Sequence, residues 1–159
     1  MHSITVCGGF ETAHRLPQLA GKCESLHGHS WQVDVTVSGE DLDSDGKLIR
    51  FEDLKRPIFG WVQEHLDHGT MLGVSDPLVG PLRDAGTKLY LFDPTADPDG
   101  PPALTADLEW PTVENVAVLL TRVASVFIRH IDDPAAGPLH VGVRVKETAI
   151  NRAAWGQWV

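Results

Sequence analysis

The sequence has few cysteines and no long hydrophobic run. Cys7 and Cys23 are the only two cysteines among its 159 residues, too few for the disulfide framework of a small secreted domain. No apolar stretch approaches the roughly 20 residues that cross a bilayer, and the N-terminus lacks the basic and hydrophobic regions of a signal peptide. We also find no internal repeat of the kind that builds solenoids. These absences predict a cytoplasmic protein that does not use a membrane as a partner.

Basic residues are also scarce. There are 13 Lys+Arg against 22 Asp+Glu, which gives a formal net charge of −9, whereas nucleic-acid-binding proteins need a basic surface to neutralise phosphates. DNA or RNA is therefore not expected as a partner. The hydrophobic fraction of 42% and the charged fraction of 22% are typical of a globular chain, and the length suits a single domain spanning residues 1–159.

Alternating hydrophobicity predicts four strands. Residues 3–14 and 29–38 alternate between apolar and polar side chains, residues 139–146 alternate in the same way, and residues 152–159 suggest a fourth strand. A period of two with one apolar face indicates half-buried strands of an antiparallel sheet. Cys7 lies within the first of these apolar strands, and we interpret it as a packing residue.

Apolar residues at helical spacing predict two helices. The first is expected to begin near Asp53, because Pro57 fits only in a first turn or at a kink. The second begins at Thr112, a suitable N-cap, and is ended by the segment 132–137, which contains Asp, Pro and Gly. The order of elements is then ββααββ. Two helices that cover one face of an antiparallel sheet make an α+β fold.

The connection between the two helices, residues 69–110, is an unusually long insertion for a compact domain. Within it, Asp76-Pro77 followed by apolar residues predicts a short helix, and residues 88–92 predict an extra strand. Residues 93–107 contain four prolines. This composition predicts an exposed and mobile loop.

Three histidines share the parity of the apolar strand faces. His27 and His29 open the second strand two residues apart, so both lie on its apolar face, and His14 has the parity of the apolar face of the first strand. Three neutral imidazoles with an open fourth position are typical of a catalytic zinc site, although imidazole also binds other divalent metals. The alternative is that each histidine is an ordinary polar residue at a strand end.

Two further features suggest acid–base chemistry. Cys23 lies in a polar loop shortly before His27, where a nearby metal and Lys22 would favour the thiolate, which is the effective base or nucleophile. An incidental surface cysteine is the alternative. Asp67 and His68 follow the first helix, where a carboxylate can orient an imidazole and raise its basicity. A simply polar helix end would look the same.

Two glutamates are also candidates. Glu147 continues the core-face parity of the third strand, where a buried carboxylate needs a cation or strong donors. A ligand with two N–H groups would meet that need, and so would a salt bridge to Lys or Arg. Glu114 falls in the first turn of the second helix, where the helix dipole favours an anion, so alone it indicates a structural role.

Several short motifs, taken together, resemble the 6-pyruvoyl-tetrahydropterin synthase and 6-carboxy-tetrahydropterin synthase family. Each motif alone is weak, but they occur in family order and, outside residues 69–110, at family-like spacing over most of the chain. The matching segments are Phe10-Glu11-Thr12-Ala13-His14-Arg15-Leu16, Cys23-Glu24-Ser25-Leu26-His27-Gly28-His29, Leu66-Asp67-His68, Pro111-Thr112-Val113-Glu114-Asn115 and Lys146-Glu147-Thr148.

This resemblance implies the tunnelling fold, ββααββ, and an assembly. Subunits of the family join their sheets edge to edge into an oligomeric barrel, commonly a homohexamer, with active sites at subunit interfaces. Edge strands that would otherwise be open are paired in this way. The site residues that the resemblance implies are His14, His27 and His29 as Zn²⁺ ligands, Cys23 as catalytic base, Asp67 and His68 as a second acid–base pair, and Glu147, Glu114 and Thr112 as substrate-binding residues, with Glu147 as the pterin anchor.

The substrate implied by the resemblance is 7,8-dihydroneopterin triphosphate. Zinc would act as a Lewis acid on its side-chain hydroxyls, and triphosphate would leave. The short gap between Cys23 and His27 resembles the bacterial carboxy-tetrahydropterin synthases of queuosine-type deazapurine biosynthesis, which also release acetaldehyde. A 6-pyruvoyl-tetrahydropterin synthase reaction is the first alternative. A non-catalytic, zinc-stabilised binding module is the second.

Two features depart from the family pattern. Arg50-Phe51 stands where members usually have Asp-Phe, which removes a helix cap. The connection over residues 69–110 exceeds the short link of the compact members, so it can reshape the pocket. A triphosphate also needs local cations on this acidic chain, and Arg15, Lys22 or Lys146 are candidates near the pocket mouth.

Overall fold

The computed structural model describes residues 1–97, 104–131 and 137–159. The elements are β1 (His2–His14), the 3₁₀ turn η1 (Lys22–Glu24), β2 (His27–Gly39), α1 (Phe51–His65), β3 (Gly69–Gly73), α2 (Val79–Asp84), β4 (Leu89–Phe92), α3 (Val113–Ile128), β5 (His140–Lys146) and β6 (Arg152–Trp158). The elements β1, β2, α1, α3, β5 and β6 reproduce the predicted ββααββ order, and β3, α2 and β4 lie within the long connection.

The six strands form one open sheet in the order β4-β3-β1-β2-β5-β6. The β1–β2, β2–β5 and β5–β6 pairs are antiparallel, as expected. The expectation of a wholly antiparallel sheet is wrong, because β3 is parallel to both β1 and β4. Parallel neighbours need a crossover connection, and α2 supplies one between β3 and β4. The sheet of a single chain is therefore mixed and is not a closed barrel.

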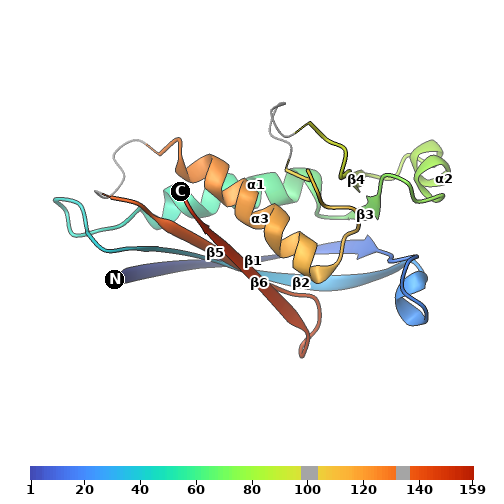
Figure 1. Cartoon of the computed structure of the whole chain (residues 1–159), viewed down its shortest axis with the longest axis horizontal. Coiled ribbons are helices and arrows are strands. Elements are labelled where there is room, and N and C mark those ends of the chain that lie inside the picture. Colours follow the sequence, from blue (N-terminus) through green and yellow to red (C-terminus); the bar gives the residue numbers. More distant parts are fainter. Residues whose placement is uncertain (98–103, 132–136) are drawn as a thin grey trace.

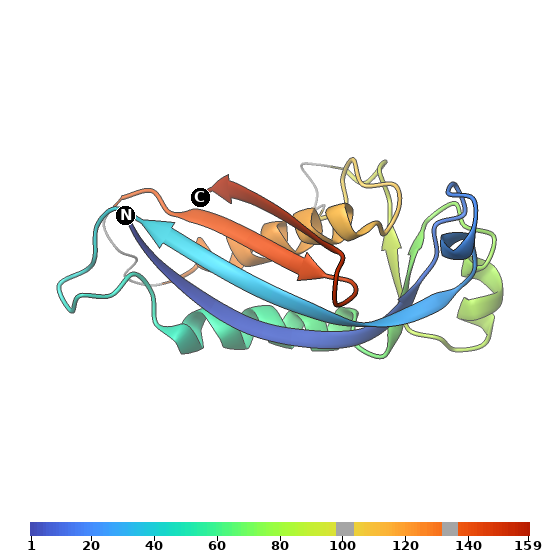
Figure 2. The same ribbon diagram turned by 90° about the horizontal axis from the view of Figure 1, so that it is seen from below.

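Helices α1 and α3 cover one face of the sheet, and the long strands β1 and β2 run beneath them (Figures 1 and 2). The core-facing side chains of β2 from Trp31 to Val37 are no more than 1% exposed, as their alternation predicts. From the helical layer, α3 contributes the buried side chains of Val116, Leu120 and Val123. The predicted α+β arrangement, with two helices on one face of the sheet, is confirmed.

The start of α1 differs from the expectation. The helix begins at Phe51 rather than near Asp53, and Pro57 lies in its second turn. Arg50 is the N-cap residue and makes no side-chain cap hydrogen bond, because a guanidinium has donors but no acceptor for the free N–H groups. The missing cap expected from the sequence is therefore confirmed.

The face of the sheet that the helices leave uncovered is polar, and Cys7 lies on it. The interpretation of Cys7 as a packing residue is wrong, because position 7 has the opposite parity to the buried Val6 and Phe10. Its thiol hydrogen-bonds the carboxylate of Asp34, its partner on β2, and this bond raises the pKa of Cys7. Arg144 on β5 donates to the same carboxylate from Nε at 3.0 Å.

The segment over residues 93–107 is only partly an exposed loop. Residues 98–103 lie outside the described residues, as do 132–136, which include most of the expected stop of the second helix. Residues 104–107 are held against α3, where Arg122 donates to the main-chain oxygens of Leu104 and Ala106 at 3.1 and 2.7 Å. Thr105 is buried, so this part of the segment packs on the domain.

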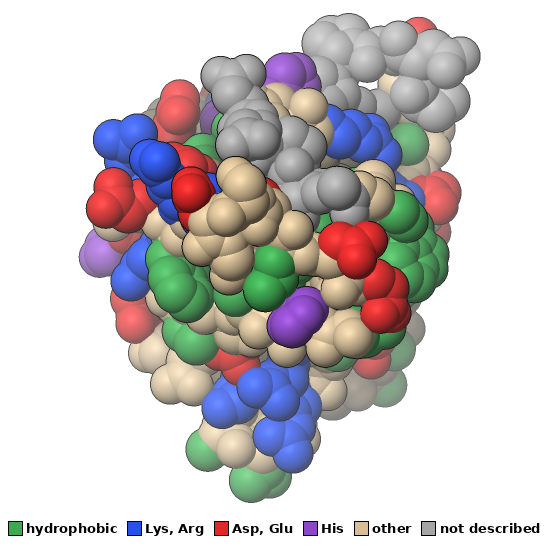
Figure 3. All heavy atoms as spheres, turned by 90° about the vertical axis from the view of Figure 1, so that its left-hand side faces the viewer, with side chains coloured by type: hydrophobic (Ala, Val, Ile, Leu, Met, Phe, Trp, Pro, Cys, Tyr) green, Lys and Arg blue, Asp and Glu red, His purple; other side chains and the backbone are tan. Residues whose placement is uncertain are grey.

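The described part of the chain contains no helix that is long and apolar enough to cross a membrane. Acidic and basic side chains both occur on the end of the molecule shown in Figure 3, so neither sign of charge occupies that face alone.

Candidate metal centre

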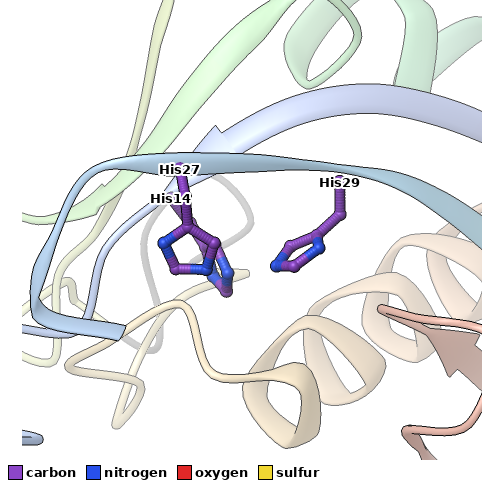
Figure 4. A group of neighbouring side chains, drawn as sticks. All are labelled: His14, His27 and His29. Atoms are coloured by element: carbon purple, nitrogen blue, oxygen red, sulfur yellow. The ribbon is translucent and has the colours of Figure 1, made fainter. Parts of the chain in front are cut away.

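His14, His27 and His29 converge at one end of the sheet, as strand parity predicts. His14 is the last residue of β1 and lies directly opposite His27, the first residue of β2, while His29 lies opposite Thr12. All three side chains point to the same side of the sheet, toward the start of α3 (Figure 4). Their potential ligand atoms lie within 4.8 Å of one another. This group can hold a metal ion.

Main-chain carbonyl groups fix two of the rings. His14 Nδ1 lies 2.9 Å from the oxygen of Pro111, and His27 Nδ1 lies 2.7 Å from the oxygen of Ser25. A carbonyl oxygen only accepts, so each Nδ1 carries the hydrogen and each Nε2 keeps its lone pair. Such second partners orient metal-binding imidazoles. Both partners are main-chain oxygens, which every residue carries, so the sequence could not reveal these two hydrogen bonds.

Burial favours the neutral imidazole at His14 and His29. Removal from water lowers the pKa of His14 to about 4, despite the opposing effect of its bond to Pro111. Burial also lowers the pKa of His29, against the nearby charge of Glu147. Protonated imidazole has no lone pair for a metal, so a lowered pKa favours the ligating form over a wide range of pH.

Glu147 lies beside the histidines, at the end of β5. Its Oε1 is 3.3 Å from His14 Nε2 and 3.8 Å from His29 Nε2. Those two Nε2 atoms are buried without a hydrogen bond. Neutral imidazole lone pairs that face a carboxylate repel it unless a cation lies between them, so the donor set fits a divalent metal ion. Among the described residues no Lys or Arg forms a salt bridge with Glu147, and the side chains that face its carboxylate are those of His14 and His29.

A pocket of about 390 Å³ opens next to this group. Its lining includes His29 and Glu147 together with Lys146. The last residue pair between β2 and β5 joins Gln32 to Lys146, and the pocket lies just beyond this pair. The main chain of β2 around Gly28 and Ser30 borders the pocket. A flat ligand with N–H groups can therefore reach both the Glu147 carboxylate and the histidine group.

Cys23 is exposed in the turn η1. Its main-chain oxygen accepts a hydrogen bond from the N–H of Leu16 at 2.8 Å, which holds η1 against the chain just after His14. Within the described residues the metal-binding group consists of the three imidazoles and does not include the Cys23 thiol. The thiol is thus a neighbour of the group in the chain, and its role stays a prediction.

Asp67 and His68 form a hydrogen-bonded pair away from the three histidines. Asp67 Oδ2 lies 2.8 Å from His68 Nδ1, and Asp67 Oδ1 accepts from the N–H of Glu11 at 2.8 Å. The bond from Glu11 is the main reason that the pKa of Asp67 is lowered. Glu11 precedes His14 by three residues of an extended strand, about 10 Å. The side chain of His68 is 78% exposed, whereas that of His14 is fully buried.

The remaining predicted residues occupy the start of α3 and the chain after His14. Thr112 is the N-cap of α3 and its side chain accepts from the N–H of Asn115 at 3.2 Å, while Glu114 is exposed in the first turn. Arg15 Nε lies 3.4 Å from Oδ2 of the fully buried Asp76. The sequence suggested Arg15 as a cation for triphosphate and gave no sign of the partner Asp76.

Comparison with known proteins identifies the family of the chain. Residues 3–156 match the family model described as 6-pyruvoyl tetrahydropterin synthase. Curated relatives named 6-carboxy-5,6,7,8-tetrahydropterin synthase include those of Rickettsia bellii, 32% identical over 55% of this chain and 67% of the relative, and of Synechocystis sp., 39% identical over 43% and 58%.

Solved structures share the fold. The 6-pyruvoyl tetrahydropterin synthase of Plasmodium vivax superposes with a TM-score of 0.68 at 16% identity over 100% of both chains, and an uncharacterized Wolinella succinogenes protein with 0.67 at 19% identity over 97% of each. At such identities the likeness concerns the fold alone. The family model, however, spans nearly the whole chain and includes the histidine group, Glu147 and the Asp67–His68 pair. The chain therefore belongs to the 6-pyruvoyl tetrahydropterin synthase family.

Proposed function

We propose that this protein is a zinc-dependent 6-carboxy-5,6,7,8-tetrahydropterin synthase that converts 7,8-dihydroneopterin triphosphate with release of triphosphate and acetaldehyde. The observation that carries the proposal is the group of three imidazoles beside the Glu147 carboxylate, at the edge of an open pocket. The names of the curated relatives support the carboxy reaction over the pyruvoyl reaction. Membership of the queuosine-type pathway is part of the same proposal.

Each residue of the proposed site has a distinct task. Bound zinc would supply Lewis acidity to the hydroxyl groups of the substrate side chain. Glu147 would accept hydrogen bonds from the pterin N–H groups, which its half-buried carboxylate, with a side chain 18% exposed, suits. Glu114 and Thr112, at the start of α3, remain predicted substrate-binding residues. Cys23 would remove a proton from the side chain as its thiolate.

The Asp67–His68 pair would move a second proton. Asp67 holds Nδ1 of His68, so Nε2 is the nitrogen that can exchange a proton with substrate. The His68 ring is exposed. Asp67 contacts β1 at Glu11, three residues before His14, so the pair lies away from the histidine group. We therefore propose that the pair serves an active site shared with a second subunit, in a homohexamer of the kind that the family implies.

A product assay tests the proposal. Purified zinc-loaded protein is incubated with 7,8-dihydroneopterin triphosphate, and the products are identified by mass. The carboxy synthase gives 6-carboxy-tetrahydropterin and acetaldehyde, whereas the pyruvoyl synthase gives 6-pyruvoyl-tetrahydropterin without a two-carbon fragment. Unchanged substrate would instead favour a non-catalytic binding module. The pairing of Asp67 with His68 disfavours that last alternative, because a structural metal site needs no such pair.

A further inference from the structure

A lysine directly before strand β4, in the connection between α1 and α3, reaches back to the end of α1. Lys88 Nζ donates to the main-chain oxygens of Gln63 at 3.2 Å and of Asp67 at 2.7 Å. The last carbonyl groups of a helix lack partners inside it, and a cation there interacts favourably with the helix dipole. Lys88, which follows Asp67 by 21 residues in the sequence, thus caps the C-terminus of α1.

The main chain of Lys88 binds the other side of the same segment. Its oxygen accepts from the N–H of Thr70 at 2.9 Å. A Cβ atom on Gly69 would lie 3.2 Å from both the Lys88 oxygen and its Cδ, so Lys88 packs directly over this glycine. One residue therefore holds the backbone at Asp67 and at Thr70, on both sides of His68.

Strand β1 supplies the remaining contacts of the segment. The N–H of Glu11 donates to Asp67 Oδ1, and the N–H of His68 donates to the Glu11 oxygen at 2.6 Å. His68 has a φ of 55°, a conformation that a residue with a Cβ keeps only when its surroundings impose it. Its exposed ring is hydrogen-bonded to Asp67 Oδ2. The orientation of the His68 ring therefore depends on the position of the Asp67 main chain.

From these contacts we propose that Lys88 is a positioning residue for the Asp67–His68 pair, and that the insertion between α1 and α3 thereby serves the catalytic centre. The inference rests on the proposed function, in which this pair moves a proton. Without the ammonium group, two carbonyl groups lose their cap while the contacts with Glu11 remain. The segment would still fold but would hold His68 less firmly. Turnover should then fall while substrate and zinc binding persist, because the Lys88 ammonium, within the described residues, bonds main-chain oxygens and none of the predicted zinc or substrate ligands.

Three variants test this role. In Lys88→Met the aliphatic stem remains and the ammonium is lost, Lys88→Arg keeps a donor, and Lys55→Met removes an exposed lysine from α1 as the matched control. We expect Lys88→Met to lower kcat about 10- to 100-fold, the size of a small misplacement of a catalytic group, with KM and zinc content within about twofold. Lys88→Arg should restore most of the turnover, and Lys55→Met should match the wild type. Lys88→Gln repeats the test if the methionine variant folds poorly.

A double-mutant cycle with His68→Ala separates positioning from general stability. If Lys88 acts through His68, Lys88→Met should add almost no further loss of kcat in the His68→Ala background. An equal loss in both backgrounds, or wild-type kcat in Lys88→Met while His68→Ala is slow, would overturn the inference and leave the proposed function standing. Wild-type turnover in His68→Ala would overturn the catalytic role of the pair, and this inference with it.

Discussion

The three histidines differ in burial but have little redundancy. His14 is fully buried, whereas His29 is 19% exposed, and a three-ligand site depends on each donor. We expect His14→Ala, His27→Ala and His29→Ala each to lose most of the bound zinc. Metal analysis of the purified variants, with His130→Ala as a control on an exposed histidine of the same chain, measures this. Full zinc occupancy in all three variants would remove these residues from the metal site.

Substitution of Cys23 tests the catalytic step rather than metal binding. Cys23→Ala should keep zinc and substrate binding while turnover falls about 10²–10⁴-fold, the usual contribution of a positioned general base. Cys23→Ser should not restore turnover, because a hydroxyl carries almost no anion at neutral pH. Zinc content and turnover are measured on the same preparations, with Cys7→Ser as the control.

The possible outcomes for Cys23 separate three roles. Loss of zinc together with turnover would make Cys23 a ligand, and turnover above about a tenth of the wild type in both variants would make it an incidental surface residue. Only loss of turnover with zinc retained agrees with the base.

At the scale of elements, the insertion is tied to the chain just after β1 by the ion pair of Asp76 with Arg15. Asp76 Oδ1 accepts from the N–H of Leu78 at 2.8 Å, and its Oδ2 faces Arg15. Asp76→Ala leaves the Arg15 guanidinium, 16% exposed, without its carboxylate, a loss of about 3 kcal/mol for a pair with one partner removed. We expect the Tm to fall by roughly 6–12 °C, measured by circular dichroism.

The exposed Asp84 at the end of α2 offers the matched control for Asp76. Asp84→Ala removes the same charge without a buried partner and should change the stability by less than about 0.5 kcal/mol. Equal effects of the two substitutions would show that the Arg15–Asp76 pair does not anchor the insertion.

The sequence predicted the alternating strands and the histidine group, but only part of the insertion. Alternation works for β1 and β2 because one face is buried and the other is open. It fails for β3, whose residues from Thr70 to Gly73 are all buried, so that no polar face marks the strand. The short helix and the strand β4 were predicted and are present. Cys7 was misinterpreted although parity alone places it outward.

Parts of the site had no signal in the side-chain pattern. The carbonyl of Pro111 orients His14, and the main chain of Glu11 holds the Asp67–His68 pair. Every residue carries the same backbone groups, so only the fold decides which of them reach a site. Glu147 could be found because a carboxylate at an apolar position of a strand is costly and requires a partner.

At the scale of the whole molecule, β4 and β6 form the edges of the sheet, and each pairs with one neighbouring strand in the described part of the chain. The edge strand β6 carries Trp155 and Trp158, which are 38% and 60% exposed. Large exposed apolar side chains on an unpaired edge favour association with another strand. We expect a homo-oligomer, a hexamer by the family resemblance, and light scattering after size exclusion measures it. A monomer that stays active at nanomolar concentration would contradict this expectation.

The position of the exposed His68 leads to a sharper test of assembly. If each active site combines Cys23 and the histidine group of one subunit with Asp67 and His68 of a neighbour, then two inactive variants can complement each other. Cys23→Ala and His68→Ala leave the three imidazoles unchanged. In mixed oligomers formed by co-expression in equal amounts, random association gives roughly a quarter of the sites both functional parts. Turnover should rise to about that fraction of the wild type, far above either variant alone.

The control for this complementation is each variant purified alone and then combined without subunit exchange, which should stay inactive. A double variant with both substitutions in one chain, expressed alone, should also be inactive, because no subunit then carries an intact half. Mixed oligomers that remain as slow as their parents would place Cys23 and His68 in the same subunit's site. His68 would then have to turn from its exposed position beside Glu11 of β1 toward the histidine group, which its bond to Asp67 and the Lys88 cap both oppose.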